Sequence, residues 1–107
     1  MINYSRVEQA LTRLAETDQP CAELKADVER SKHKAKAIHS AAMARHGGTV
    51  AEKEGFADNL PEYRDAMGEY FRAIEYYEGM RNERNRQELV IEVWRSINSA
   101  RNKGQIV

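Results

Sequence analysis

The sequence predicts an all-α protein, an elongated antiparallel helical hairpin or bundle with one long C-terminal helix. Only two prolines and six glycines interrupt the 107 residues. Ala, Glu, Arg, Lys and Gln dominate the chain, and these residues favour helix over strand. Apolar side chains recur at a spacing of three and four, the period of a helix with one buried face.

The first helix is predicted over residues 4–16. Ser5-Arg6-Val7-Glu8 has the form of a capping box, which satisfies free backbone N–H groups at a helix start. The apolar face expected for this helix consists of Tyr4, Val7, Leu11 and Leu14. Thr17-Asp18-Gln19-Pro20 is predicted to end it, because proline lacks the N–H that continues a helix.

The second helix is predicted over residues 20–46, and it ends at the paired glycines of His46-Gly47-Gly48-Thr49. One face keeps a heptad spacing typical of paired helices. Its members are Cys21, Leu24, Val28, Ser31, Ala35, Ile38 and Ala42. This narrow, small-residue face predicts close packing against another helix.

Two further helices are predicted over residues 49–58 and 61–102. Thr49-Val50-Ala51-Glu52 is a second capping box, and Pro61 suits the first turn of a helix. Gly104 stands where a C-terminal cap is expected. The last helix would be ~60 Å long at ~1.5 Å per residue, about the combined length of the first two. One domain, residues 1–107, is therefore expected, with the first two helices antiparallel to the last.

Charge gives the expected register of this pairing. Residues 30–46 carry five basic and no acidic residues, whereas residues 47–80 carry three basic and eight acidic ones. The basic residues 30–36 are expected opposite the acidic stretch that contains Glu69, Glu75 and Glu78. The acidic Glu23, Asp27 and Glu29 are expected near Arg81, Arg84 and Arg86. Exposed pairs of this kind stabilise by only ~0.2–1 kcal/mol, so they set direction more than stability.

The segment MRNERNRQE, residues 80–88, has no apolar side chain after its methionine. Before it, one apolar stripe of the helix consists of Tyr63, Met67, Tyr70, Ile74 and Tyr77. After it, Val90, Val93, Trp94 and Ile97 form a stripe that projects close to the opposite side at ~100° per residue. The prediction is that the last helix changes its buried face at this segment.

The second stripe is predicted to lie in a homodimer or partner interface. Helix one offers chiefly Val7, Leu11 and Leu14 as a cover, so a patch centred on Trp94 would stay partly exposed. Exposed apolar patches centred on tryptophan are typical of association surfaces. The alternative is that helix one covers the patch and Trp94 belongs to the core.

Composition and motifs point away from an enzyme. No nucleophile stands beside a base, no glycine-rich phosphate loop occurs, and no paired Glu-x-x-His motif is present. His33, His39 and His46 lack the spacing of metal ligands, so no metal or cofactor is expected. The lone Cys21 cannot form an internal disulfide, and no run suits a signal peptide or membrane span. A reducing cytoplasmic location, with no membrane partner, is expected.

Residues 47–104 carry a string of motifs that resembles small helical proteins encoded in bacteriophage early regions, near genes for recombination and single-strand binding. The matching elements are Gly48-Thr49-Val50, a helix rich in Tyr, Glu and Ala, Arg81-Asn82, and Ile91-Glu92-Val93-Trp94-Arg95-Ser96. The resemblance implies a phage protein that works in the host cytoplasm by contacting DNA-processing or defence machinery.

The expected function is therefore that of a non-enzymatic interaction protein that binds host or phage replication, recombination or defence machinery. An anti-CRISPR or other host-inhibitor role belongs within this expectation. The alternative is a small DNA-binding accessory protein of recombination. Under either hypothesis, six basic side chains are candidates for contacts with a protein partner or with phosphates. They are Arg30, Lys32, Lys36, Arg81, Arg84 and Arg86. Zero formal net charge makes general nucleic-acid attraction the weaker explanation.

Overall fold

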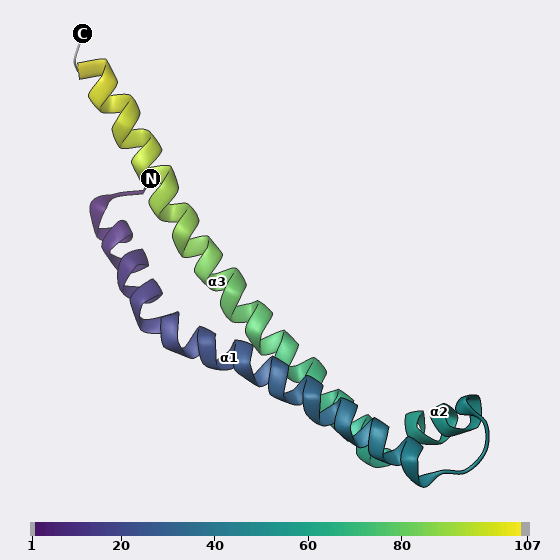
Figure 1. Cartoon of the computed structure of the whole chain (residues 1–107). Helices are drawn as coiled ribbons and strands as arrows, with labels where there is room; N and C mark the ends of the chain where they lie inside the picture. The colour runs from purple at the N-terminus through teal and green to yellow at the C-terminus, as the bar shows by residue number, and fades with distance from the viewer. Residues whose placement is uncertain (1, 106–107) are drawn as a thin grey trace. The chain divides into compact units, whose positions relative to one another are not determined.

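The chain forms three α-helices in a computed structural model that describes residues 2–105, the last of them through its backbone alone. The helices are α1 (Tyr4–Arg45), α2 (Val50–Asp58) and α3 (Pro61–Gln105), as Figure 1 shows. No strand occurs between residues 2 and 105. The all-α class and the long C-terminal helix are confirmed.

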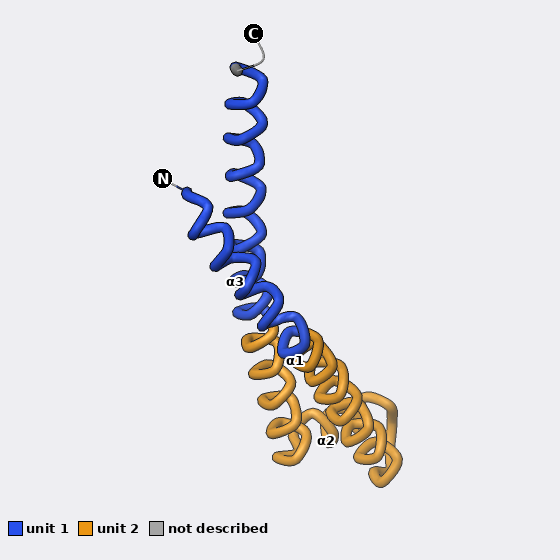
Figure 2. Tube along the Cα trace, turned by 90° about the vertical axis from the view of Figure 1, so that its left-hand side faces the viewer, with its two compact units in different colours: residues 1–21, 78–107 blue, residues 22–77 orange. Residues whose placement is uncertain are grey.

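The helices divide into two compact units (Figure 2). We call Met1–Cys21 with Glu78–Val107 the terminal unit, and Ala22–Tyr77, which contains α2, the α2 unit. Within each unit, a segment of α1 pairs antiparallel with a segment of α3. In the terminal unit, Arg6 contacts Gln87 and Arg13 contacts Glu83, so one residue number rises as the other falls.

The α2 unit shows the same antiparallel order. Lys34 contacts Glu69, and the ring of His39, further along α1, lies against Tyr63, which is earlier in α3. The antiparallel helical hairpin expected from the sequence is therefore confirmed. The expectation of a single domain stays a prediction.

The predicted break at residues 17–20 is wrong, because α1 continues through Pro20. Proline removes one backbone hydrogen bond and crowds the preceding turn, at a cost of ~3 kcal/mol. A continuous heptad series of buried and half-buried residues nevertheless runs along α1 on both sides of Pro20. Its members are Val7, Ala10, Leu14, Thr17, Cys21, Leu24, Val28, Ser31, Ala35, Ile38 and Ala42. Burial of this continuous face outweighs the local preference to end the helix.

The start of α1 also differs from the prediction. The side chain of Asn3, not of Ser5, caps the helix, because its Oδ1 accepts from the backbone N–H of Arg6 at 2.9 Å. Tyr4 and Leu11, two members of the predicted apolar face, are 63% and 53% exposed. Ala10 takes the buried place instead, at 0% exposure. Its small side chain allows the close approach of α3, a role that an apolar count does not reveal.

The predicted change of buried face within α3 is wrong as well. The heptad positions of α3 that are not exposed run without a shift through residues 80–88. They are Tyr63, Ala66, Tyr70, Ala73, Tyr77, Met80, Arg84, Gln87, Ile91, Trp94 and Asn98. Within residues 80–88 the polar side chains of Arg84 and Gln87 occupy two of these positions, so a pattern that counts only apolar residues does not detect the buried face there. The segment MRNERNRQE is thus the middle of a helix, and after Met80 its inward positions, Arg84 and Gln87, are polar.

The predicted starts of the two later helices are confirmed. Helix α3 begins at Pro61 as predicted, and α2 begins at Val50, one residue after the predicted start. Thr49 caps α2, and its Oγ1 accepts from the backbone N–H of Glu52 at 3.2 Å. Gly48 precedes it with φ 104°, a left-handed conformation that favours glycine. Gly104, expected as a C-terminal cap, lies inside α3.

Candidate functional site

The terminal unit has a small buried cluster of Val7, Ala10 and Ile91. Val90 and Trp94 are partly buried and pack against this cluster, together with Ile2 and Leu14. The ring of Tyr4 lies 6.1 Å from that of Trp94, at an interplanar angle of 52°. Two of the four residues predicted for an interface therefore contribute to the core of this unit. Ile91, which is 9% exposed, was not among the predicted residues, although a heptad series extended from Tyr77 reaches it.

The other two predicted interface residues, Val93 and Ile97, are each 37% exposed. Leu89, which was not among the predicted interface residues, is 57% exposed. Residues four apart lie nearly above one another on a helix, so these three side chains form one apolar line along α3. We call Leu89, Val93 and Ile97 the α3 stripe.

The three arginines of residues 81–86 have different environments. Arg84 points into the terminal unit and donates from Nη1 to Leu14 O at 2.8 Å and to Thr17 Oγ1 at 2.7 Å. Its Nη2 lies 3.5 Å from the Asp18 carboxylate. Arg84 is therefore a structural residue, and the acid it meets lies earlier in α1 than the predicted Glu23, Asp27 and Glu29.

Arg81 and Arg86 are exposed. Arg81 lies 3.7 Å from Glu78, one turn away on the same helix, rather than against α1. Arg86 helps to lower the pKa of Glu83, although the main cause is the hydrogen bond from Arg13. Arg13 binds both carboxylate oxygens of Glu83, at 2.5 and 3.1 Å. This pairing raises the pKa of Arg13 in turn.

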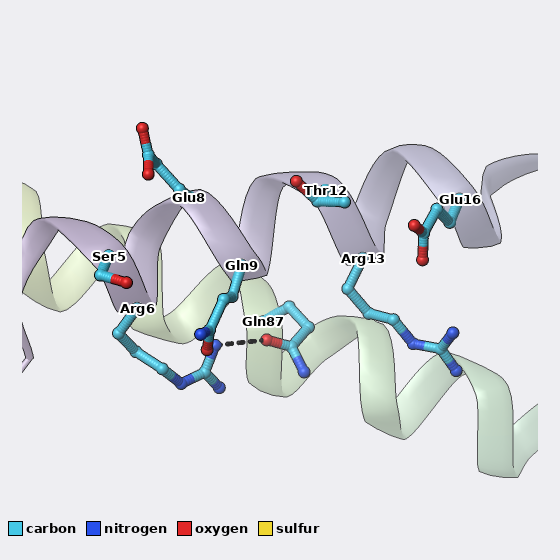
Figure 3. Close-up of a pocket in the computed structure, with 8 residues that line it drawn as sticks. All are labelled: Ser5, Arg6, Glu8, Gln9, Thr12, Arg13, Glu16 and Gln87. Carbon is cyan, nitrogen blue, oxygen red and sulfur yellow. Dashed lines mark hydrogen bonds between the residues drawn. The ribbon is translucent and has the colours of Figure 1, made fainter.

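A shallow polar groove runs along α1 in the terminal unit (Figure 3). It is lined by Ser5, Arg6, Glu8, Gln9, Thr12, Arg13, Glu16 and Gln87. Arg6 and Arg13 extend toward α3, where Arg6 Nη1 donates to Gln87 Oε1 at 3.0 Å, whereas Glu8 extends away from α3. Two basic and two acidic side chains balance in this lining, and both arginines have protein partners. The groove therefore offers no defined charge to a ligand.

The basic residues 30–36 of α1 separate into two groups in the α2 unit. Arg30 pairs with Asp27 on its own helix, and Lys34 Nζ lies 2.9 Å from Glu69 Oε2. The Lys34–Glu69 pair bears out the predicted pairing at one position. Glu78, which was also predicted opposite the basic segment, lies 3.7 Å from Arg81 of its own helix. Lys32 and Lys36 form no ion pair with any residue from 2 to 105.

Lys32 and Lys36 instead line a second groove, which we call the lysine groove. It has a volume of about 360 Å³ and lies between α1 and α3 of the α2 unit. Its lining consists of Lys32, Ala35, Lys36, His39, Ser40, Tyr63, Met67 and Tyr70. The His39 ring lies 4.8 Å from that of Tyr63, and its Nε2 is 2.7 Å from Asp58 Oδ1.

The remaining histidine of note is His46, whose ring stacks on Phe56 with a centroid distance of 4.6 Å. Its Nδ1 is buried without a hydrogen-bond partner in the described part of the chain. Across residues 2–105, no group of three or more His, Cys, Asp or Glu side chains is arranged to hold a metal ion.

No described helix combines the length and apolar character needed to cross a membrane. Comparison with protein-family models, with curated proteins and with solved structures finds no match to this chain.

Proposed function

We propose that this chain is a non-enzymatic interaction protein that binds a protein partner through the α3 stripe. The observation that carries the proposal is the exposure of three large apolar side chains, Leu89, Val93 and Ile97, in one line along a helix. Single exposed apolar residues are ordinary on protein surfaces, but a continuous line of them is a feature of association surfaces.

The geometry of the stripe favours a helical binding mode. Residues at i, i+4 and i+8 supply the anchors with which a helix enters an apolar groove of a partner. Val90 and Trp94, which flank the stripe, are held by the buried cluster of the terminal unit. The stripe is thus attached to a packed part of the unit, which reduces the entropy lost on binding.

The proposed setting is a bacteriophage protein that binds replication, recombination or defence machinery of the bacterial host, with inhibition of a defence complex such as CRISPR as one form. It is supported by the resemblance of residues 47–104 to phage early-region proteins, because this span contains the α3 stripe.

DNA binding is the second candidate function, and the cationic side chains of Lys32 and Lys36 favour it. Both lack an acidic partner among the described residues. Against it, Arg84 is engaged inside the terminal unit, and Arg30 and Arg81 have acidic neighbours. These three arginines belong to the six basic residues that were predicted as phosphate contacts. Because they already have partners within the protein, they are less available to bind DNA.

The test begins with affinity purification of a partner protein from bacteria that express this chain. The partner is then purified separately from the chain. Its affinity is measured for the wild-type chain and for a triple variant, Leu89→Ser, Val93→Ser and Ile97→Ser. We expect the triple variant to bind at least tenfold more weakly with an unchanged thermal melt, since these side chains are exposed.

The matched control is Leu11→Ser, which removes an exposed leucine of α1, 53% exposed, outside the stripe. Equal affinity of the triple variant and the wild type would refute the α3 stripe as the binding surface. Gel-shift titrations with single- and double-stranded DNA over a range of salt concentrations test the second candidate. A steep salt dependence that disappears in a Lys32→Gln, Lys36→Gln variant would favour DNA binding.

A further inference from the structure

We propose that the lysine groove is a recognition site for an acidic peptide segment that carries one large apolar side chain. The inference rests on the proposed function only in taking the ligand to be part of a protein. The groove belongs to the α2 unit and shares no residue with the α3 stripe. The two surfaces can therefore be tested separately.

Charge is the first argument. Lys32 and Lys36 are four residues apart, about 6 Å along the helix at ~1.5 Å per residue, so both ammonium groups serve the same rim of the groove. Their sequence neighbours Arg30 and Lys34 point elsewhere and pair with Asp27 and Glu69. Asp27 and Glu69 thus neutralise the arginine and the lysine that lie outside the groove. Two cations remain that can form charge-assisted hydrogen bonds with carboxylates.

Shape is the second argument. Ala35, at 3% exposure, lies at the bottom of the groove, and its small side chain leaves space that a larger residue would fill. Tyr63, Met67 and Tyr70 form the wall contributed by α3. Methionine adapts to irregular apolar partners, and tyrosine offers apolar area with a polar tip. A volume of about 360 Å³ is at the small end of ligand pockets, ~300–1,000 Å³, and suits one large side chain.

The surroundings favour a short acidic peptide over a nucleic-acid strand. Residues 22–77 hold nine Lys or Arg and ten Asp or Glu, a net charge of −1, so no wide positive field attracts a polyanion. Asp58, at the His39 end of the groove, adds a carboxylate that would repel an extended phosphate backbone. The Tyr63 ring is also in contact with His39, which restricts base stacking on it. A short peptide carries only a few carboxylates, and these can lie beside the two lysines without extending along the groove as a phosphate backbone would.

The experiment is a titration of the full ¹⁵N-labelled chain with a blocked pentapeptide, Glu-Glu-Phe-Glu-Glu, followed by NMR chemical shifts. We expect shifts at residues that line the groove, such as Ala35, His39 and Met67, and none at Leu89, Val93 or Ile97. Replacing Lys32 and Lys36 together by Gln should weaken binding about fivefold, the effect expected for two exposed ionic contacts. The peptide Gln-Gln-Phe-Gln-Gln should bind as weakly to the wild type, and Glu-Glu-Gly-Glu-Glu should also lose affinity.

The control variant is Lys25→Gln with Lys53→Gln, which changes the net charge of the same unit equally but alters no residue of the groove. An equal loss in this control, or tighter binding of a five-nucleotide thymidine oligonucleotide than of the peptide, would overturn the proposal. Ala35→Leu provides an independent check, since it should fill the groove and reduce peptide affinity without removing charge. If Ala35→Leu leaves the affinity unchanged, the peptide does not enter the groove. The triple variant of the α3 stripe should bind the peptide normally, so failure of either proposal is distinguishable from failure of the other.

Discussion

The guanidinium group of Arg84 is fixed to two acceptors of α1, Leu14 O at 2.8 Å and Thr17 Oγ1 at 2.7 Å. Thr17 is only 2% exposed, and its hydroxyl donates to Arg13 O at 2.7 Å, so it can accept from Arg84 at the same time. Both side chains occupy heptad positions of their helices. A polar layer thus stands where a coiled coil usually has apolar residues, and such layers specify register.

Replacing Arg84 by Ala should therefore destabilise the protein by about 1–2 kcal/mol, since it removes a charged donor from partly buried acceptors. Urea unfolding followed by circular dichroism measures the change. Arg81→Ala is the matched control, because Arg81 is exposed, and it should change stability by no more than about 0.5 kcal/mol. Equal effects of the two variants would contradict a structural role for Arg84.

Replacing Pro20 by Ala should stabilise the protein by about 1–3 kcal/mol. The substitution restores a backbone N–H within α1 and relieves the crowding of the preceding turn. Pro61→Ala is the control, since Pro61 is the first residue of α3, where the missing N–H has no helical partner. A gain for Pro61→Ala as large as that for Pro20→Ala would show that the helix interior is not the cause.

The pair Arg13–Glu83 should make stability depend on pH on the acid side. The hydrogen bond from Arg13 lowers the pKa of Glu83 below its ordinary value of 4.5 in the folded protein. The pair therefore contributes its stabilisation above the unfolded-state pKa and loses it as pH falls through the lower folded-state value. The stability difference between wild type and Arg13→Gln should be present at pH 7 and should shrink below pH 4.5.

An NMR titration of the Glu83 side chain gives the direct check, because its pKa should rise in Arg13→Gln. Arg101→Gln, which removes an equal charge from the exposed end of α3, should leave the Glu83 titration unchanged. A constant stability difference between pH 7 and pH 3 would count against the proposed cause.

Gly48→Ala should destabilise the α2 unit by about 1–2 kcal/mol. Gly48 has φ 104°, a backbone conformation that is strained for any residue with a Cβ, and the Glu52 carboxylate would also have to move away from the added atom. Gly47→Ala is the matched control, because no atom lies within 4 Å of an added Cβ at that position. Thermal unfolding of the two variants should differ by several degrees, and coincident melts would contradict the argument.

Trp94 and Ile97 should respond differently to substitution. Trp94→Ala should lower the thermal melting temperature clearly, because Trp94 packs on the cluster around Ile91 and against Tyr4. Ile97→Ala should leave the melt nearly unchanged, since its side chain is 37% exposed.

Light scattering over a range of protein concentrations shows whether either variant changes self-association. A wild-type dimer that Ile97→Ala dissociates would identify a second copy of this chain as one partner of the α3 stripe.

Local signals in the sequence were sufficient for the all-α class, for the cap at Thr49 and for the start of α3 at Pro61. The buried face of α1 after Pro20 was also predictable, because its heptad members are apolar or small over three turns and more. These features depend on residues close in sequence, whose caps, propensities and spacing act over one or two turns.

Tertiary structure alone decided the continuation of α1 through Pro20, the unshifted buried face of α3 and the division of the basic segment into paired and unpaired lysines. Each of these features depends on the opposite helix. Packing against α3 offsets the cost of Pro20 within α1, acceptors of α1 bind Arg84, and the Glu69 carboxylate of α3 binds Lys34. The burial of a side chain and the formation of an ion pair both depend on contacts between residues that are far apart in the chain. A periodicity that counts only apolar residues therefore misses the face at Arg84 and Gln87, where polar side chains point inward.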